Sequence, residues 1–232
     1  MKTAILVDGG FYHRRAYTLF GAKSPEDRAI ELATYCHKHM NYHGIKAAED
    51  DLYRVFYYDC PPMDRKLFHP FLKRDVDFKK SDHYQWMNAF LAELKKKRKF
   101  ALRLGKLSDT QACYTIKPDA IKKLCRGAIK VEDLKESDFR LNVEQKGVDM
   151  KIGIDIASLA YKKQVQRIIL ISGDSDFVPA AKLARREGID FILDSMWATI
   201  KPELHEHIDG LRTCCPRPKM IEKQMTATVE KG

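Results

Sequence analysis

Short apolar runs alternate with amphipathic stretches along most of the chain. Runs such as Ile168–Ile171 are almost wholly apolar, which is typical of strands buried on both faces of a parallel sheet. The predicted strands cover residues 3–7, 52–58, 100–104, 139–143, 167–172 and 189–193. The stretches with helical spacing cover residues 24–44, 82–97, 147–161, 177–186 and 201–208. This order predicts an α/β fold with helices on both faces of a central, mostly parallel sheet.

Aspartates stand at the ends of several predicted elements. Asp8 ends the first strand, and Asp149 begins the helix that precedes the 167–172 strand. Asp174 and Asp176 follow that strand directly. Ligands of parallel sheets bind beyond the carboxyl ends of the strands, so we expect these acids to meet along one edge. Carboxylates held together raise one another's pKa, and a site with oxygen ligands alone favours Mg²⁺ or Mn²⁺ over zinc.

Helix capping is a second explanation for each of these aspartates. Asp174 or Asp176 can cap the helix that follows, and for any single aspartate capping is the simpler interpretation. The coincidence of Asp8, Asp149 and Asp174 at corresponding ends of separate elements favours a shared site. Two glycines after Asp8 also let the backbone approach a ligand closely.

Three segments together resemble the NYN domains of the LabA-like family, which belong to the PIN-like nucleases. They are AILVDGGF at 4–11, QKGVDMKIGIDIASLA at 145–160 and ISGDSDFVPAAKLARREGID at 171–190. The resemblance implies a three-layer α/β/α sandwich around a central parallel sheet. It also implies a metal-dependent ribonuclease site built from clustered aspartates. Matched position by position, Asp8, Asp149 and Asp174 are the expected metal ligands, and Asp176 joins them as a catalytic residue.

Three further residues have supporting roles in this interpretation. Asp155 matches a recurrent acid of the family, but it lies six residues, or about 240° of helix rotation, beyond Asp149. We therefore rank Asp155 as a supporting residue, with Lys151 as its expected partner. Ser172 is expected to hydrogen-bond a carboxylate or the scissile phosphate, with the local backbone as the simpler alternative. Lys146 is expected to neutralise phosphate charge.

The first segment departs from the family pattern at Phe11, where many NYN domains carry an asparagine. The side-chain amide that could position substrate or a metal-bound water is missing there. The four residues that follow are candidates to replace it: Tyr12, His13, Arg14 and Arg15. Because Phe11 leaves activity itself open, a non-catalytic nucleic-acid-binding or regulatory protein stays an alternative to the ribonuclease. A haloacid-dehalogenase-like phosphatase needs a second aspartate where Gly10 stands, which argues against that class.

The net charge of +10 comes from the middle of the chain. Residues 61–130 carry 18 Lys and Arg against 7 Asp and Glu, whereas the rest of the chain is close to neutral. We expect one domain over residues 1–212 with a basic insertion at 61–130, followed by a flexible tail over residues 213–232. Residues 106–136 show no clear pattern, apart from a possible short helix after Pro118.

The basic residues predict an RNA partner, single-stranded or structured. The candidates to bind it are Arg14, Arg15, Lys73, Arg74, Lys79 and Lys80. Lys95–Lys99 is equally well explained as a solvated helix end. Tyr84 and Trp86 offer stacking faces, although Trp86 shares an apolar stripe with Phe90 and is expected in the core.

Composition excludes several classes of protein. The sequence is 44% hydrophobic, which is too apolar for a disordered chain, and its longest aliphatic run has four residues, too few to span a membrane. The N-terminal segment lacks a signal-peptide core, and the six cysteines lack Cys-x-x-Cys spacing. We therefore expect a cytoplasmic protein with reduced thiols and no membrane partner. The sequence does not decide whether the protein forms a homodimer.

Overall fold

A six-stranded parallel sheet forms the centre of the molecule in the computed structural model, which describes residues 1–41, 48, 51–108 and 112–218. Its strands are β1 (Thr3–Asp8), β2 (Leu52–Asp59), β5 (Phe100–Leu104), β10 (Arg167–Ile171), β11 (Asp190–Asp194) and β12 (Gly210–Leu211). Their order across the sheet is β12-β11-β10-β1-β2-β5, and every neighbouring pair is parallel. The predicted parallel sheet is therefore confirmed.

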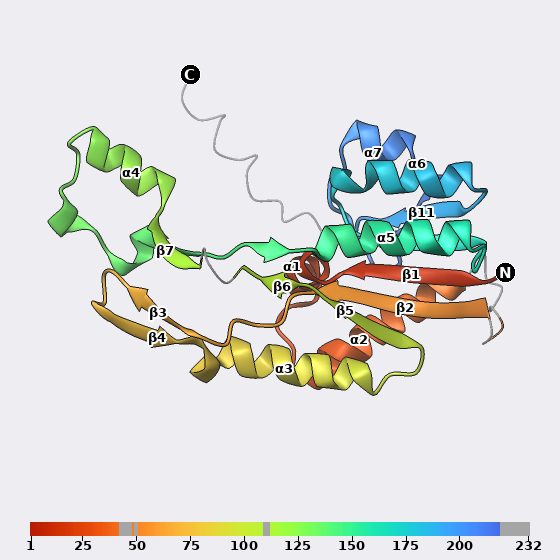
Figure 1. Cartoon of the computed structure of the whole chain (residues 1–232), viewed down its shortest axis with the longest axis horizontal. Helices are drawn as coiled ribbons and strands as arrows, with labels where there is room; N and C mark the ends of the chain where they lie inside the picture. The colour runs from red at the N-terminus through yellow and green to blue at the C-terminus, as the bar shows by residue number, and fades with distance from the viewer. Residues whose placement is uncertain (42–47, 49–50, 109–111, 219–232) are drawn as a thin grey trace, which may run out of the picture.

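Helices cover both faces of this sheet (Figure 1). One layer holds α1 (Gly9–Phe20), α2 (Pro25–Met40) and α3 (Asp82–Lys95). The other layer holds α5 (Val148–Tyr161), α6 (Val178–Arg186) and α7 (Pro202–Glu206). Two clusters of buried apolar residues, one on each side of the sheet, join the layers into the predicted α/β/α sandwich. Within the described part of the chain, no helix is long and apolar enough to cross a membrane.

Side chains along each strand alternate between the two layers, and this alternation divides the acids at the strand ends. In β1, Leu6 packs in the cluster under α5 and α6, and Val7 packs in the cluster under α1, α2 and α3. Asp8 therefore continues on the α5 side. In β2, Tyr57 belongs to the α1 side, and Asp59 follows it there.

A lobe extends beyond one end of the sheet (Figure 1). It contains the hairpin β3 (Lys66–His69) and β4 (Arg74–Asp77), the pair β7 (Cys113–Ile116) and β8 (Phe139–Asn142), and helix α4 (Pro118–Cys125). Rings join the two antiparallel pairs, because His69 lies with its centroid 4.1 Å from that of Tyr114. The short pair β6 (Lys106–Leu107) and β9 (Gln145–Lys146) connects this lobe to the sandwich. Four 3-10 helices complete the described elements: η2 (Phe78–Lys80), η3 (Val131–Asp133), η4 (Glu136–Asp138) and η5 (Ser175–Phe177).

The structure differs from the sequence-based domain organisation in two places. The stretch 61–130 is not one insertion, because α3 and β5 inside it belong to the central sandwich. The chain also stays on the fold past residue 212: Thr213 donates a hydrogen bond to Asp194, 3.0 Å away, and Cys215 is buried. Most of the expected tail, residues 219–232, lies outside the described residues.

Candidate active site at the switch point of the sheet

The chain leaves β1 in one direction and returns on its other side, which creates a switch point between β1 and β10. From β1 it passes to β2 and β5, and only later adds β10, β11 and β12 on the opposite edge. The carboxyl ends of the two strands at such a point border a crevice, and ligands of open α/β sheets bind there. Asp8 is the last residue of β1, and Asp174 follows the end of β10 by three residues.

Asp8 is held in a fixed position by two hydrogen bonds. The backbone N–H of Phe11 donates to its Oδ1 over 3.0 Å, so Asp8 caps α1. The hydroxyl of Ser172 donates to its Oδ2 over 3.1 Å, and the same hydroxyl accepts the backbone N–H of Asp174. Burial raises the pKa of Asp8, although the two hydrogen bonds and the nearby charge of Arg14 oppose this rise. Ser172 thus connects the ends of β1 and β10.

The other predicted acids lie around Asp8. Asp149 is the second residue of α5, and its pKa is raised by partial burial and by the charges of Asp8, Asp174 and Asp176. Asp174 accepts the backbone N–H of Asp176 over 3.0 Å and caps η5, so it is a cap as well as a member of the group. We call Asp8, Asp149, Asp174 and Asp176 the acidic cluster.

The donor chemistry of the acidic cluster fits a divalent cation. Its side chains offer carboxylate oxygens only, which are the ligands that Mg²⁺ and Mn²⁺ prefer. Among the described residues, no three His, Cys, Asp or Glu side chains are grouped tightly enough to enclose one ion. A cation bound here would therefore keep several waters, as Mg²⁺ commonly does in proteins.

Phe11 occupies the space next to the turn after β10. A Cβ atom added to Gly173 would lie 2.9 Å from Cε2 of the Phe11 ring, so the ring packs directly on this turn. Phe11 is largely buried, and it presents an apolar ring to this turn. Gly173 thus lacks a side chain because Phe11 fills its place.

Comparison of the sequence with models of known protein families identifies the family of this chain. The NYN domain model matches residues 76–209, more than half of the chain. The chain belongs to the NYN domain family. The match includes Asp149, Asp174 and Asp176, and Asp8 lies before it. A crystal structure of a protein of unknown function from Vibrio parahaemolyticus is similar over 90% of both chains, at 16% identity and a TM-score of 0.45. No curated protein matches the chain.

NYN domains belong to the PIN-like nuclease superfamily, whose members typically use divalent metals and act on nucleic acids. The sequence analysis named four residues after Phe11 that could replace the missing asparagine amide. In this NYN domain they have different surroundings. The Tyr12 hydroxyl donates to Glu31, and Arg15 donates from Nε to the carbonyl oxygen of Met196 over 3.1 Å. Arg15 thus has a partner within the fold, and its role toward RNA stays a prediction. Arg14 is exposed and close enough to Asp8 to lower its pKa.

Two supporting residues of the NYN domain lie outside the acidic cluster. Asp155 accepts the Tyr58 hydroxyl over 2.8 Å and pairs with Nε of Arg103 over 3.0 Å. Its partner is thus Arg103 and not Lys151, because the helix turns Asp155 toward β2 and β5. Lys146 lies in β9, with its Nζ 3.5 Å from Glu144, close in sequence to Asp149.

Asp59 is a site residue that the sequence analysis missed. It is only 5% exposed, and its carboxylate accepts the Tyr57 hydroxyl and the backbone N–H of Cys60, each over 2.7 Å. The Tyr57 hydroxyl also lies 2.9 Å from Nε2 of His13. Burial raises the pKa of Asp59, and the charge of Asp8 adds to this rise. The rule that selected Asp8 would have found Asp59, because both end parallel strands.

His13 gives the fold a pH dependence with a definite sign. Burial, helped by the charges of Arg28 and His83, lowers its pKa to about 4. The neutral ring therefore stabilises the fold above pH 6.5, and this contribution is lost as the pH falls toward 4. Between pH 7 and 4.5 we expect the wild type to lose about 2 kcal/mol of unfolding free energy relative to His13→Gln. Urea denaturation at each pH measures the unfolding free energy of the wild type and of His13→Gln. If the two free energies fall in parallel as the pH is lowered, the prediction is contradicted.

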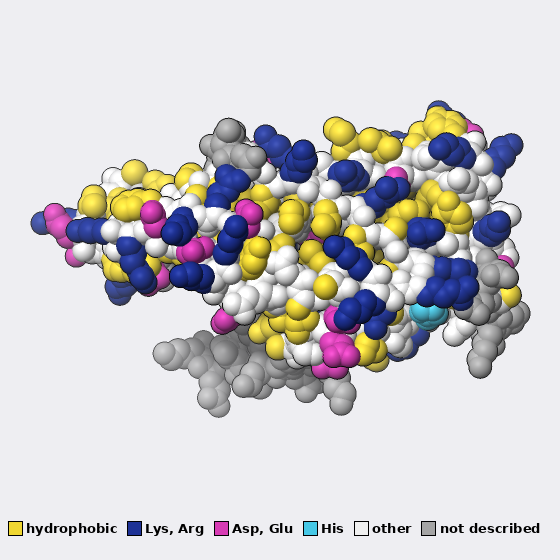
Figure 2. All heavy atoms as spheres, turned by 60° about the horizontal axis from the view of Figure 1, so that its bottom comes forward, with side chains coloured by type: hydrophobic (Ala, Val, Ile, Leu, Met, Phe, Trp, Pro, Cys, Tyr) yellow, Lys and Arg dark blue, Asp and Glu magenta, His cyan; other side chains and the backbone are white. Residues whose placement is uncertain are grey.

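The predicted RNA-binding residues of the lobe lie in two groups. Lys73 ends the turn between β3 and β4 and Arg74 begins β4, whereas Lys79 and Lys80 belong to η2, just before α3. All four are exposed. Lys and Arg side chains recur along the whole face shown in Figure 2, with Asp and Glu between them on the lobe. The positive charge is thus spread along the molecule.

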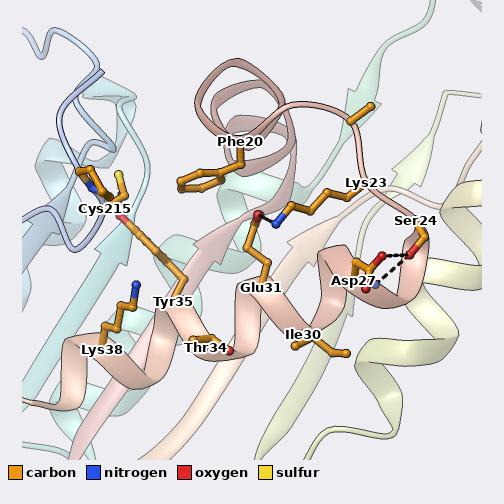
Figure 3. A pocket seen from close by; sticks show the side chains of 12 residues that line it. Phe20, Lys23, Ser24, Asp27, Ile30, Glu31, Thr34, Tyr35, Lys38 and Cys215 are labelled. Carbon is orange, nitrogen blue, oxygen red and sulfur yellow. Dashed lines mark hydrogen bonds and ion pairs between the residues drawn. The ribbon is translucent and has the colours of Figure 1, made fainter. Parts of the chain in front are cut away.

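A hollow of about 680 Å³ next to α2 lies apart from this chemistry. Figure 3 shows Lys23 reaching Glu31 across its wall, at 2.7 Å, and Ser24 bonded to Asp27 at the start of α2. No member of the acidic cluster lines it. These contacts hold the segment before α2 against that helix, and we assign the hollow no function.

Proposed function

We propose that this NYN domain protein is a metal-dependent ribonuclease of the LabA-like type. The observation that carries the proposal is that the Ser172 hydroxyl joins the Asp8 carboxylate to the backbone of Asp174 at the switch point of the sheet, with Asp149 near enough for their charges to raise its pKa. Separate elements bring these carboxylates together even though they repel one another. A divalent cation offsets this repulsion, and phosphodiester hydrolysis is chemistry that such cations support.

Each residue of the site has a distinct task in this proposal. Asp8, Asp149 and Asp174 hold Mg²⁺ or Mn²⁺, directly or through waters, and the bound cation supplies a water of lowered pKa and compensates phosphate charge. Ser172 fixes the orientation of the Asp8 carboxylate by its hydrogen bond to Oδ2. Asp176 orients a water beside the cluster. Exposed Arg14 offers a positive charge to the RNA phosphate beside Asp8.

The proposal predicts cleavage of RNA by the purified protein only when a divalent cation is present. A labelled single-stranded RNA and a hairpin RNA should both be tested with Mg²⁺, with Mn²⁺ and with EDTA. Turnover in either metal and none in EDTA is expected. Cleavage that is equally fast in EDTA would refute metal dependence.

The packing of Phe11 on Gly173 favours one alternative, an NYN domain protein that binds RNA without cleaving it. The apolar ring stands where an amide would position substrate or water. This alternative predicts RNA binding that survives Asp8→Asn and Asp174→Asn, with no cleavage by the wild type in any metal.

For either function we expect the basic residues of the lobe and η2 to bind RNA, and this can be tested through salt. Replacing Lys73, Arg74, Lys79 and Lys80 by Gln should weaken binding and flatten its dependence on salt. The affinity K falls as salt rises. For a single strand, each RNA phosphate that is no longer neutralised makes the slope of log K against log salt less steep by about 0.7. The control carries the same change at four exposed lysines of the opposite layer: Lys162, Lys163, Lys182 and Lys201. Equal slopes for the lobe variant and the control would show that the lobe is an ordinary solvated surface.

A further inference from the structure

A second cleft opens directly beside the acidic cluster. It has a volume of about 660 Å³ and lies between α1, the segment after β2 and α3. Gly10 lines this cleft, and a Cβ atom at Gly10 would lie 3.7 Å from Oδ1 of Asp8. Buried Asp59 forms part of its wall. The cleft therefore lies next to Asp8, on the side of the sheet that α1 and α3 cover.

The walls of the cleft are mainly apolar and aromatic. Trp86, His83 and Met63 line it, together with two prolines that follow β2. The Trp86 ring is half-buried and held in place, because it stacks on Phe90 with centroids 5.3 Å apart and an interplanar angle of 13°. Its Nε1 donates to the carbonyl oxygen of Lys23 over 3.0 Å. An aromatic surface fixed in this way loses little freedom when a flat ring binds to it.

A few polar groups interrupt these walls. The carboxylate of Asp59 accepts one hydrogen bond on each oxygen and keeps further lone pairs. Gln145 adds a side-chain amide from β9. Apolar walls with few polar groups are typical of sites for planar ligands that carry donors and acceptors on their edges.

We propose that this cleft binds a nucleobase of the RNA strand whose phosphate lies at the acidic cluster. The proposal rests on the proposed function for the phosphate, and on the cleft itself for the base. Stacking on an aromatic side chain is how single-stranded RNA is held in many proteins. Gly10, which lines the cleft next to Asp8, places the cleft beside the expected position of the phosphate.

Tryptophan fluorescence tests the proposal directly, because the chain has only two tryptophans. Trp197 lies elsewhere, bonded to the carbonyl oxygen of Cys215, so Trp197→Phe leaves Trp86 as a single reporter. The variant is titrated in EDTA with adenosine, guanosine, cytidine and uridine 5′-monophosphates, and with ribose 5-phosphate. We expect saturable quenching by at least one nucleotide and none by the sugar phosphate, which lacks the base. Equal responses to both, or no response to any nucleotide, would overturn the proposal.

A histidine pair supplies a matched control for binding. His83 is exposed and lines the cleft, and His205 is exposed on α7. His83→Ala should weaken the binding of a short single-stranded RNA in EDTA by about five-fold or more, the lower end of what one stacked base contributes to affinity. His205→Ala should leave affinity unchanged. Equal affinities for the two variants would contradict a base in the cleft.

The two proposals fail separately. Quenching of Trp86 by nucleotides without any metal-dependent cleavage would retain the base cleft and reject the ribonuclease. Metal-dependent cleavage with no quenching, and with unchanged affinity in His83→Ala, would retain the ribonuclease and reject the cleft.

Discussion

RNA cleavage by the Asp8→Asn and Asp174→Asn variants is expected to fall by more than about 100-fold at saturating Mn²⁺, beyond the loss that outer-shell partners of a metal typically cause. Asparagine keeps the size of the side chain but removes the charge that attracts the cation. At position 8 it also keeps the cap of α1, because its oxygen can accept the Phe11 N–H. The fall in activity therefore reports on the metal site. Initial rates on a labelled RNA measure the effect.

The matched control for these variants is Asp119→Asn. Asp119 is exposed in the first turn of α4, within the lobe and away from the sheet. This change should leave the cleavage rate within about two-fold, because surface substitutions alter stability only slightly. If Asp8→Asn and Asp174→Asn cleave as fast as Asp119→Asn, the acidic cluster is not the catalytic site.

Gly9→Ala is expected to destabilise the fold by about 2–3 kcal/mol, the upper part of the range typical of overpacking in a core. A Cβ atom at Gly9 would lie 2.5 Å from the Tyr57 hydroxyl and 2.6 Å from Oδ2 of Asp59. Tyr57 is completely buried, so its ring has no free space to move into. The added methyl group must therefore break the hydrogen bond between Tyr57 and Asp59 or displace α1.

The control, Gly153→Ala, has the opposite expected sign. Gly153 lies inside α5, where an added Cβ atom would meet nothing within 4 Å. Alanine favours a helix interior over glycine by about 1 kcal/mol, so this variant should be more stable than the wild type. Urea denaturation midpoints of the three proteins decide the matter. A Gly9→Ala midpoint at or above that of the wild type would show that α1 does not pack on Tyr57 and Asp59 in this way.

The elements of the sandwich were predictable where their apolar pattern is strong. Five of the six predicted strands lie in the sheet, within one or two residues of their expected bounds. The sixth, predicted at 139–143, is β8, which pairs antiparallel with β7 in the lobe, and β12 was not predicted. Helix α1 was missed, because Gly9 and Gly10 are poor helix formers and the segment after Asp8 resembles a turn. Its helix is stabilised instead by the Asp8 cap and by burial of Phe11 and Tyr12. The other lobe strands, β3, β4 and β7, are four residues long and were not predicted, because so few residues show little periodicity.

The candidate site was predictable in part for a similar reason. Asp8, Asp149 and Asp174 stand at ends of elements, and the topology of a parallel sheet brings such ends together. Asp59 ends a predicted strand too, but no family motif marked it. The cleft could not be predicted, because it depends on how α3 and β9, from distant parts of the chain, meet α1. Trp86 was expected in the core, and it both stacks on Phe90 and lines the cleft.

Alternation along the strands gives the site two sides with different chemistry. Asp8 joins Asp149 on the α5 side, where charged carboxylates meet solvent. Asp59 lies on the α1 side among Tyr57, His13 and the aromatic wall of the cleft. In our proposals the first side acts on the phosphate and the second holds the base. Gly9 and Gly10 separate them without side chains.

The central claim is that Asp8, Asp149 and Asp174 hold a divalent cation. Crystals of the protein soaked in Mn²⁺ test it directly, because anomalous scattering locates manganese without reference to the protein atoms. We predict an anomalous difference peak among these three carboxylates, and its disappearance in crystals of Asp8→Asn treated in the same way. Manganese that binds only elsewhere, or an equal peak in the variant, would contradict the claim.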